Sequence, residues 1–160
     1  VVWGRDAKKM DLYKKDVEKM GFKVTCAKDA SQVGASCNLI VTATCATSPV
    51  LMSEHVKAGT HITAVGADGV GKHEVDHKVL GRAQLVVADS LTQCCAFGEI
   101  SYGLKAGVIK QKNVLELGQV IRDKKGRAAS DNASITFADL TGVAVQDVVI
   151  SGMALDALRK

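Results

Sequence analysis

Residues 73–77 read H-E-V-D-H, which is the H-E-x-x-H spacing of zinc proteases. In those enzymes both histidines lie on one continuous helix and bind zinc together with a third ligand. Here Gly69 and Gly71 lie just upstream, and Asp76 is a typical N-cap for a helix that begins at His77. We therefore expect the two histidines to lie on different elements, in a polar surface segment that binds no metal.

A phosphate-binding loop is the second chemistry that a local pattern indicates. Residues 66–72 fit G-x-x-x-x-G-K, and residues 85–89 imitate the apolar strand ending in Asp that helps to hold magnesium in nucleoside triphosphatases. However, His73 stands where Ser or Thr must bind magnesium, and Asp68 would place a carboxylate in a loop built for phosphates. The residues after Lys72 are also too polar for the long buried helix that normally follows. A P-loop nucleotidase therefore stays a remote alternative.

Asp68 is suited to acid–base chemistry by its position in the chain. It follows an apolar run at residues 61–65 that predicts a buried strand, and glycines flank its loop. Ligands of parallel sheets bind beyond the carboxyl ends of the strands, where a carboxylate can exchange a proton with a substrate. A turn-capping role is the alternative for Asp68. Lys72 is either a charge-balancing or substrate-binding cation, or an ordinary surface lysine.

Short apolar runs alternate with amphipathic stretches, which predicts an α/β fold with a parallel sheet covered on both faces. Strands are predicted at residues 1–3, 22–25, 39–42, 61–65, 85–88 and 134–138. Helices are predicted at residues 7–20, 53–57, 91–106, 143–159 and part of 114–121. We expect a buried strand at residues 39–42. Buried apolar faces are expected on the helix at 7–20, through Met10, Tyr13, Val17 and Met20, and on the alanines and valines of the helix at 143–159.

Composition narrows the class of protein further. The 160 residues are enough for one domain. The net charge of +4 is modest and only 4% of the residues are aromatic, so we expect no nucleic-acid partner. No apolar run approaches the ~18 residues of a membrane helix, so we expect no membrane partner. The five cysteines are odd in number and form no C-x-x-C pair, which favours a reducing compartment and predicts a cytoplasmic protein.

Several stretches, taken in order, resemble the ornithine cyclodeaminase and mu-crystallin family. They are I-V-T-A-T at residues 40–44, G-T-H-I-T-A-V-G-A-D at 59–68 with G-K at 71–72, D-S at 89–90, G-E-I at 98–100, L-E-L-G at 115–118, G-R at 126–127, I-T at 135–136 and D-L-T-G-V-A-V-Q-D at 139–147. The order and spacing of these pieces over nearly the whole chain carry the resemblance, since each piece alone is short.

The resemblance implies a Rossmann-like, doubly wound parallel sheet. No G-x-G-x-x-G turn is found, so the first strand and the glycine-rich turn are expected to lie before Val1. Residues 1–142 would then be a partial dinucleotide-binding domain, and residues 143–160 a helix that returns toward the domain for substrate binding and dimerisation. Because the first strand is central in this fold, we expect unpaired inner edges and no complete six-stranded sheet.

The resemblance also implies roles for individual residues. Asp68 corresponds to the family's acid–base carboxylate beside the substrate nitrogen, and Lys72 to a lysine of the same loop. Further positions correspond to the cofactor site, namely Thr42, Ala43, Thr44, Val65, Gly66, Thr141 and Gly142. Hydride transfer from an amine carbon requires a neutral amine, and a carboxylate in hydrogen-bonding range can take that proton.

Cofactor choice is expected to depend on the end of the strand at residues 1–3. An NAD site usually carries a carboxylate there for the ribose hydroxyls, whereas Gly4 occupies that place in this chain. Arg5 follows, with Lys8 and Lys9 about one helical turn further on, and a guanidinium can bind a 2′-phosphate bidentately. Although Asp6 is acidic, it stands one position late. These residues favour NADP, with NAD as the alternative.

The resemblance leaves three functions open beside the nucleotidase. The first is an imine or ketimine reductase that uses NADPH on a small amino or imino acid. The second is an ornithine cyclodeaminase, which makes L-proline and ammonia from L-ornithine with NAD. The third is a non-catalytic binding protein of the mu-crystallin kind. For each of them the family implies a homodimer.

Overall fold

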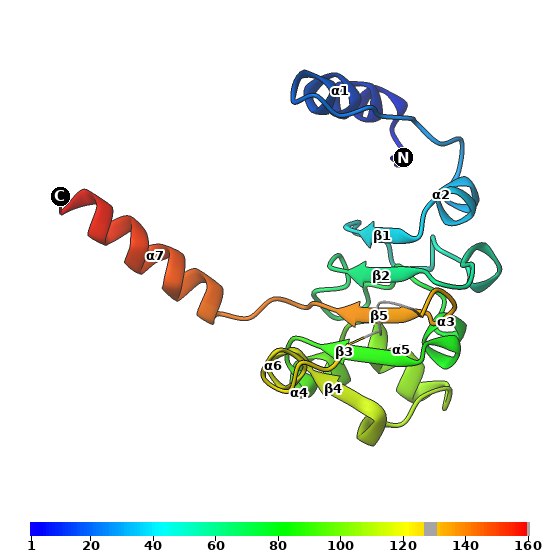
Figure 1. The fold of residues 1–160 in the computed structure, drawn as a ribbon, viewed down its shortest axis with the longest axis vertical. Helices are drawn as coiled ribbons and strands as arrows, with labels where there is room; N and C mark the ends of the chain where they lie inside the picture. The colour runs from blue at the N-terminus through cyan, green and yellow to red at the C-terminus, as the bar shows by residue number, and fades with distance from the viewer. Residues whose placement is uncertain (127–130, 160) are drawn as a thin grey trace.

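A five-stranded parallel sheet forms the centre of the computed structural model, which describes residues 1–126 and 131–159. Every neighbouring pair is parallel, and the strand order is β1-β2-β5-β3-β4. The strands are β1 at Leu39–Thr42, β2 at His61–Ala64, β3 at Leu85–Ala88, β4 at Val114–Glu116 and β5 at Thr136–Asp139 (Figure 1). The predicted α/β fold with a Rossmann-like parallel sheet is confirmed.

Seven α-helices connect or flank these strands within the described residues. They are α1 at Ala7–Lys19, α2 at Ala30–Ser36, α3 at Lys78–Arg82, α4 at Leu91–Ala96, α5 at Glu99–Lys105, α6 at Leu117–Arg122 and α7 at Val145–Leu158, with short 3₁₀ helices at Ser53–His55 and Gln111–Asn113. The single helix expected at residues 91–106 is wrong, since Gly98 breaks it into α4 and α5 by adopting a φ of +93°. An L-residue rarely adopts that backbone conformation.

The core lies between the sheet and its covering helices. Ile62 of β2 and Phe137 of β5 are fully buried at the centre of the sheet, against Leu80 of α3 and Ile100 of α5. Ile62 and Phe137 are paired across neighbouring strands, so their side chains lie on the same face of the sheet and meet the helices in a single cluster. The core therefore fixes the carboxyl ends of β2 and β5, where the expected site residues begin.

The edge strand β1 is buried on one face only. Its exposure alternates, with Ile40 buried and Leu39 and Val41 exposed by 65% and 62%. Our expectation of a buried strand is therefore wrong for half of β1. The reason is its edge position, because no described helix covers the outer face of β1 (Figure 1).

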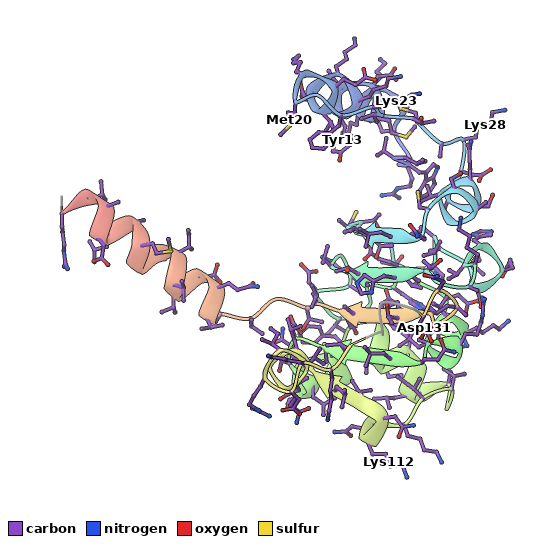
Figure 2. The ribbon with its side chains drawn as sticks, in the orientation of Figure 1. Tyr13, Met20, Lys23, Lys28, Lys112 and Asp131 are labelled. Carbon is purple, nitrogen blue, oxygen red and sulfur yellow. The ribbon has the colours of Figure 1, made fainter. Side chains whose placement is uncertain are left out.

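The N-terminal residues form a small unit beside the sheet. The strands expected at residues 1–3 and 22–25 reduce to one parallel bridge between Val2 and Cys26. Helix α1 is capped by the Asp6 side chain and ends before Gly21, which has a φ of +91°. The apolar face of α1 is not buried, contrary to our expectation, since Tyr13 and Met20 are exposed by 54% and 72% and project from the helix (Figure 2).

A cavity of about 570 Å³ separates this N-terminal unit from β1. Val2, Trp3 and Tyr13 line one side of it, and Ile40 and Val41 of β1 line the other. The described residues thus form no complete six-stranded sheet, as expected. The cavity lies where the resemblance places a central strand, and the presence of that strand stays a prediction.

Helix α7 extends away from the sheet, with the C-terminal end of the described chain at its tip (Figure 1). Its valines and alanines are exposed, so the expected buried face is wrong in this structure. The physical reason is that no other described element packs against α7. A return of residues 143–160 toward a second domain stays a prediction. None of the described helices is both long and apolar enough to span a membrane.

Candidate functional site

The loops that leave the carboxyl ends of the strands gather at one edge of the sheet, because all five strands are parallel. A cavity of about 440 Å³, which we call the Asp68 cavity, opens between the loops after β2, β3 and β5. Among the residues that line it are Val65, Asp68, Asp89, Thr141 and Gly142. Four of these were predicted as site residues, although more than 70 residues separate the two pairs in the sequence.

Asp68 and Lys72 form a hydrogen-bonded ion pair within this loop. The hydrogen bond from Lys72 holds the pKa of the Asp68 carboxyl below its usual value, and the same bond raises the pKa of the Lys72 ammonium. Asp68 is therefore ionised at neutral pH and can accept a proton. The pair supports the charge-balancing interpretation of Lys72.

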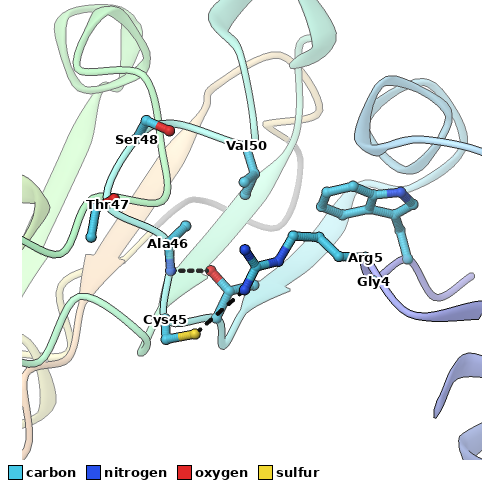
Figure 3. Close-up of a pocket in the computed structure, with 9 residues that line it drawn as sticks. Gly4, Arg5, Cys45, Ala46, Thr47, Ser48 and Val50 are labelled. Carbon is cyan, nitrogen blue, oxygen red and sulfur yellow. Dashed lines mark hydrogen bonds between the residues drawn. The ribbon is translucent and has the colours of Figure 1, made fainter.

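A smaller cavity of about 210 Å³, the Arg5 cavity, lies where the loop after β1 meets the N-terminal unit. Figure 3 shows the Arg5 guanidinium reaching toward Cys45, with its Nη2 3.6 Å from the Cys45 Sγ. Gly4 and Thr44 also line the Arg5 cavity, as do Thr47 and Ser48. One guanidinium beside hydroxyl side chains and loop backbone fits a phosphate group of a dinucleotide.

Three predicted cofactor positions line neither of these two cavities, namely Thr42, Ala43 and Gly66. Ala43 lines the 570 Å³ cavity along β1, and Gly66 lies at the end of β2. Thr42 and Gly66 both donate hydrogen bonds to one side chain that sequence analysis did not single out as functional, namely Glu74. All nine of the cofactor positions that we predicted thus lie at this edge of the structure, with Thr42 as the last residue of β1 and the others outside the strands.

Glu74 corrects our expectation that residues 73–77 form a polar surface segment. Its side chain is fully buried, and His73 and Asp76 are also buried. His73 lies in the loop, whereas His77 is the N-cap of α3, so the two histidines lie on different elements as expected. No local pattern signals the burial of Glu74, because its partners come from other loops.

Asp89 is a second residue of this candidate site that the sequence did not single out, although it follows the strand predicted at residues 85–88. Its Oδ2 accepts a hydrogen bond from the Gly142 N–H at 2.7 Å, and its Oδ1 accepts one from the Thr141 hydroxyl at 3.1 Å. The amide of Gln93 donates to the Gly142 carbonyl at 2.7 Å from the other side. Asp89 therefore holds the loop after β5 against the Asp68 cavity.

Residues 66–72 do not form the structure that a P-loop requires. They form bends and turns, and the next helix, α3, begins only at Lys78. In a P-loop the helix must start directly at the loop, so that its first N–H groups point at the phosphates. This geometry argues against the nucleotidase alternative.

Two more buried carboxyl groups lie beneath this edge, at Glu99 and Asp139. Burial raises the pKa of Glu99 to about 8 and that of Asp139 to about 7. The Glu99 Oε2 lies 3.4 Å from the Nε2 of His73, whose pKa is lowered by burial, and the His73 ring stacks on Tyr102. The Glu99–His73 contact is therefore one between a protonated carboxyl and a neutral imidazole near pH 7.

The raised pKa values of Glu99 and Asp139 lead us to expect that the free energy of unfolding decreases as the pH rises. Folded Glu99 and Asp139 keep protons that the unfolded chain releases above a pH of about 4 to 5, so the free energy of unfolding decreases up to their folded pKa values. We expect urea denaturation to show a loss of at least ~1.4 kcal/mol between about pH 6.5 and 8.5. His73, whose pKa is lowered, opposes this trend while the unfolded chain's histidine is still protonated, so its effect fades above a pH of about 6.5.

Glu99→Gln keeps the size of the side chain and is neutral at every pH, so it should reduce this loss. Glu54→Gln, at an exposed glutamate of the Ser53–His55 helix, serves as the control and should leave it unchanged. An unfolding free energy that stays constant across the window would show that both carboxyls are ionised in the folded state.

The amino-acid sequence of this chain matches the model of a known protein family. The model of the ornithine cyclodeaminase/mu-crystallin family matches residues 1–160. Among curated relatives, the iminosuccinate reductase of Paracoccus denitrificans is 39% identical over 134 residues, covering 83% of this chain and 41% of the relative. The alanine dehydrogenase of Archaeoglobus fulgidus is 40% identical over 139 residues, covering 86% of this chain and 42% of the relative.

A solved relative shares the fold. The Thermococcus litoralis Δ1-pyrroline-2-carboxylate reductase, in complex with NADH and L-proline, superposes with a TM-score of 0.89 at 25% identity, covering 97% of this chain and 48% of that one. The chain therefore spans less than half of the length of each of these relatives.

Proposed function

Because the chain belongs to the ornithine cyclodeaminase/mu-crystallin family, we propose that the full-length protein is an NAD(P)-dependent imine or ketimine reductase. It would transfer hydride between a nicotinamide and the carbon that bears the amino or imino group of a small amino or imino acid. The iminosuccinate and pyrroline-carboxylate reductases among its relatives support this substrate class. The observation that carries the proposal is an ionised Asp68 in one cavity with Val65, Thr141 and Gly142.

The described residues fit a dinucleotide that runs along this edge from the Arg5 cavity to the Asp68 cavity. Arg5 and the loop at Thr44 would hold the phosphate-bearing end, and Val65 and Gly142 would border the nicotinamide. The nicotinamide, when bound, supplies or accepts the hydride. Asp68 takes a proton from the substrate ammonium before oxidation, or returns one to the nitrogen during reduction.

A two-part assay tests this function on the full-length protein. Oxidation of NADPH or NADH by Δ1-pyrroline-2-carboxylate would support a reductase. Conversion of L-ornithine to L-proline and ammonia without net change in NAD absorbance would instead support the cyclodeaminase alternative. If neither nicotinamide cofactor binds, as judged by nicotinamide fluorescence, the proposed function is wrong.

We further propose that NADPH is preferred over NADH, since Gly4 offers no carboxylate to the ribose and Arg5 offers a guanidinium to a 2′-phosphate. Arg5→Ala should weaken NADPH binding by about 1–3 kcal/mol and leave NADH binding nearly unchanged. Lys112→Ala, beside the outer edge strand β4, is the matched control (Figure 2). Titration of both cofactors by nicotinamide fluorescence measures the difference, and equal affinities in the starting protein would rule the preference out.

The remaining proposals concern the assembly and the compartment. An archaeal alanine dehydrogenase with a TM-score of 0.84 to this chain is described as a dimer with bound NAD, which supports a homodimer for the full-length protein. A cytoplasmic location stays a prediction from cysteine usage.

A further inference from the structure

Glu74 lies between two loops that the proposed cofactor site needs. The first follows β1, whose last residue is Thr42, at residues 43–46, and the second follows β2 at residues 65–68. Glu74 belongs to neither loop, since it stands on the segment that precedes α3. Its side chain is 0% exposed, so its carboxylate faces only protein groups.

The carboxylate of Glu74 accepts three hydrogen bonds from these two loops. Its Oε2 accepts from the Thr42 hydroxyl at 2.8 Å and from the Gly66 N–H at 2.8 Å. Its Oε1 accepts from the Thr44 N–H. One side chain thus joins the carboxyl ends of two neighbouring strands, and the charge-assisted bonds that it makes are stronger than neutral ones.

The backbone of Glu74 is held equally firmly. Its carbonyl accepts hydrogen bonds from the N–H groups of Val50 and Leu51, at 2.8 and 3.1 Å. Its own N–H donates to the Oε1 of Glu99 at 2.5 Å. Because the main chain of Glu74 cannot shift without losing these bonds, its carboxylate is a fixed reference point for both loops.

Gly66 shows how closely the loops approach this carboxylate. A Cβ atom at position 66 would lie 2.5 Å from the Glu74 carboxyl carbon and would also collide with the Thr44 carbonyl oxygen. Real side chains do not come that close, so the two loops and Glu74 pack against each other without space between them. The spacing between the loop after β1 and the loop after β2 is therefore set at Glu74.

We propose that Glu74 is a positioning residue that holds the loops at Thr42–Thr44 and Val65–Asp68 in one spacing, so that hydride transfer and proton transfer occur in register. This inference rests on the proposed function. Glu74 does not line the Asp68 cavity or the Arg5 cavity, so it acts only through the residues that it holds.

The test uses the full-length protein with the variants Glu74→Gln and Thr42→Val, and Glu54→Gln as an exposed glutamate control. Glutamine keeps the shape of Glu74 but presents an NH₂ group to an N–H donor, which breaks at least one bond. We expect kcat for the imino acid to fall about 10-fold or more, because the two loops would no longer be held in one spacing and the reacting groups would be misplaced. The primary deuterium isotope effect on kcat, measured with NADPH deuterated at C4, should rise because hydride transfer becomes slower.

Each outcome decides the question. Thr42→Val removes only one of the donors to Glu74, so it provides the test if Glu74→Gln does not fold. This variant should show a smaller fall in kcat and a smaller rise in the isotope effect. In the double variant the loss should be smaller than the product of the two single losses, because both changes remove one contact. A lower melting temperature with unchanged kcat and isotope effect would make Glu74 merely structural and overturn the inference. If the unmodified protein binds neither cofactor, the proposed function itself fails.

Discussion

Asp68→Asn should lower turnover by about 10²- to 10⁴-fold, because asparagine keeps the size of the side chain but cannot take a proton. Asp68 lies beyond the end of β2, lines the Asp68 cavity and is kept ionised by Lys72. Binding of NADPH should change little, since the carboxylate serves the substrate nitrogen. The measurement is turnover of a cyclic imino acid with NADPH, alongside a cofactor titration of the same variant.

Asp123→Asn is the control for this experiment, because Asp123 lies at the end of α6 and does not line the Asp68 cavity. Normal turnover by Asp68→Asn would show that Asp68 is a turn residue and that the proposed proton transfer is wrong. A joint loss of cofactor binding and turnover would give Asp68 a structural role.

Lys72→Met should shift the acidic limb of the pH–rate profile to higher pH, because Lys72 lowers the pKa of Asp68.

Gly66→Ala should destabilise the fold by about 3 kcal/mol, at the upper end of the cost of overpacking. The added methyl group would meet the Thr44 carbonyl oxygen and the Glu74 carboxyl group, so one of the two loops must move. Urea denaturation measures the loss of stability. The affinity for NADPH, measured at a temperature where the variant is folded, should fall as well because the loops border the proposed cofactor site.

Gly69→Ala gives a matched control in the same loop. A Cβ atom at position 69 would meet no atom within 4 Å, and Gly69 does not have a positive φ. This variant should therefore be as stable as the unmodified protein and bind NADPH equally well. If Gly66→Ala were as stable as Gly69→Ala, the close packing around Glu74 would be wrong.

Local patterns in the sequence were enough to predict much of the sheet and several site residues. The strands at Leu39–Thr42 and Leu85–Ala88 are short apolar runs bounded by polar residues, and both were predicted with the bounds that the structure has. Parallel strands place their carboxyl ends at one edge of the sheet. Because Asp68 follows a predicted strand, the sequence predicted that Asp68 lies at this edge. These features depend on residues close together in the chain.

Burial of the predicted faces was decided by the tertiary structure. The same apolar alternation makes Ile40 buried and Val41 exposed, because β1 lies at the edge of the sheet. Helix α7 is apolar but has no buried residue, since no described element packs on it. Periodicity specifies which side chains share a face, whereas only the neighbouring elements specify whether that face is covered.

The positioning carboxylates also required the tertiary structure. Glu74 meets Thr42 across 32 residues of sequence, and Asp89 meets Gly142 across 53. From its own segment, Glu74 could be interpreted only as a surface residue or as the glutamate of the H-E-x-x-H pattern at residues 73–77. No residue close to it in the sequence indicated its hydrogen-bonding partners. The sequence alone determined the strands and where polar residues follow them. The contacts between distant loops decided which of those residues are held, buried or free to react, because hydrogen bonding and desolvation depend on neighbours in space.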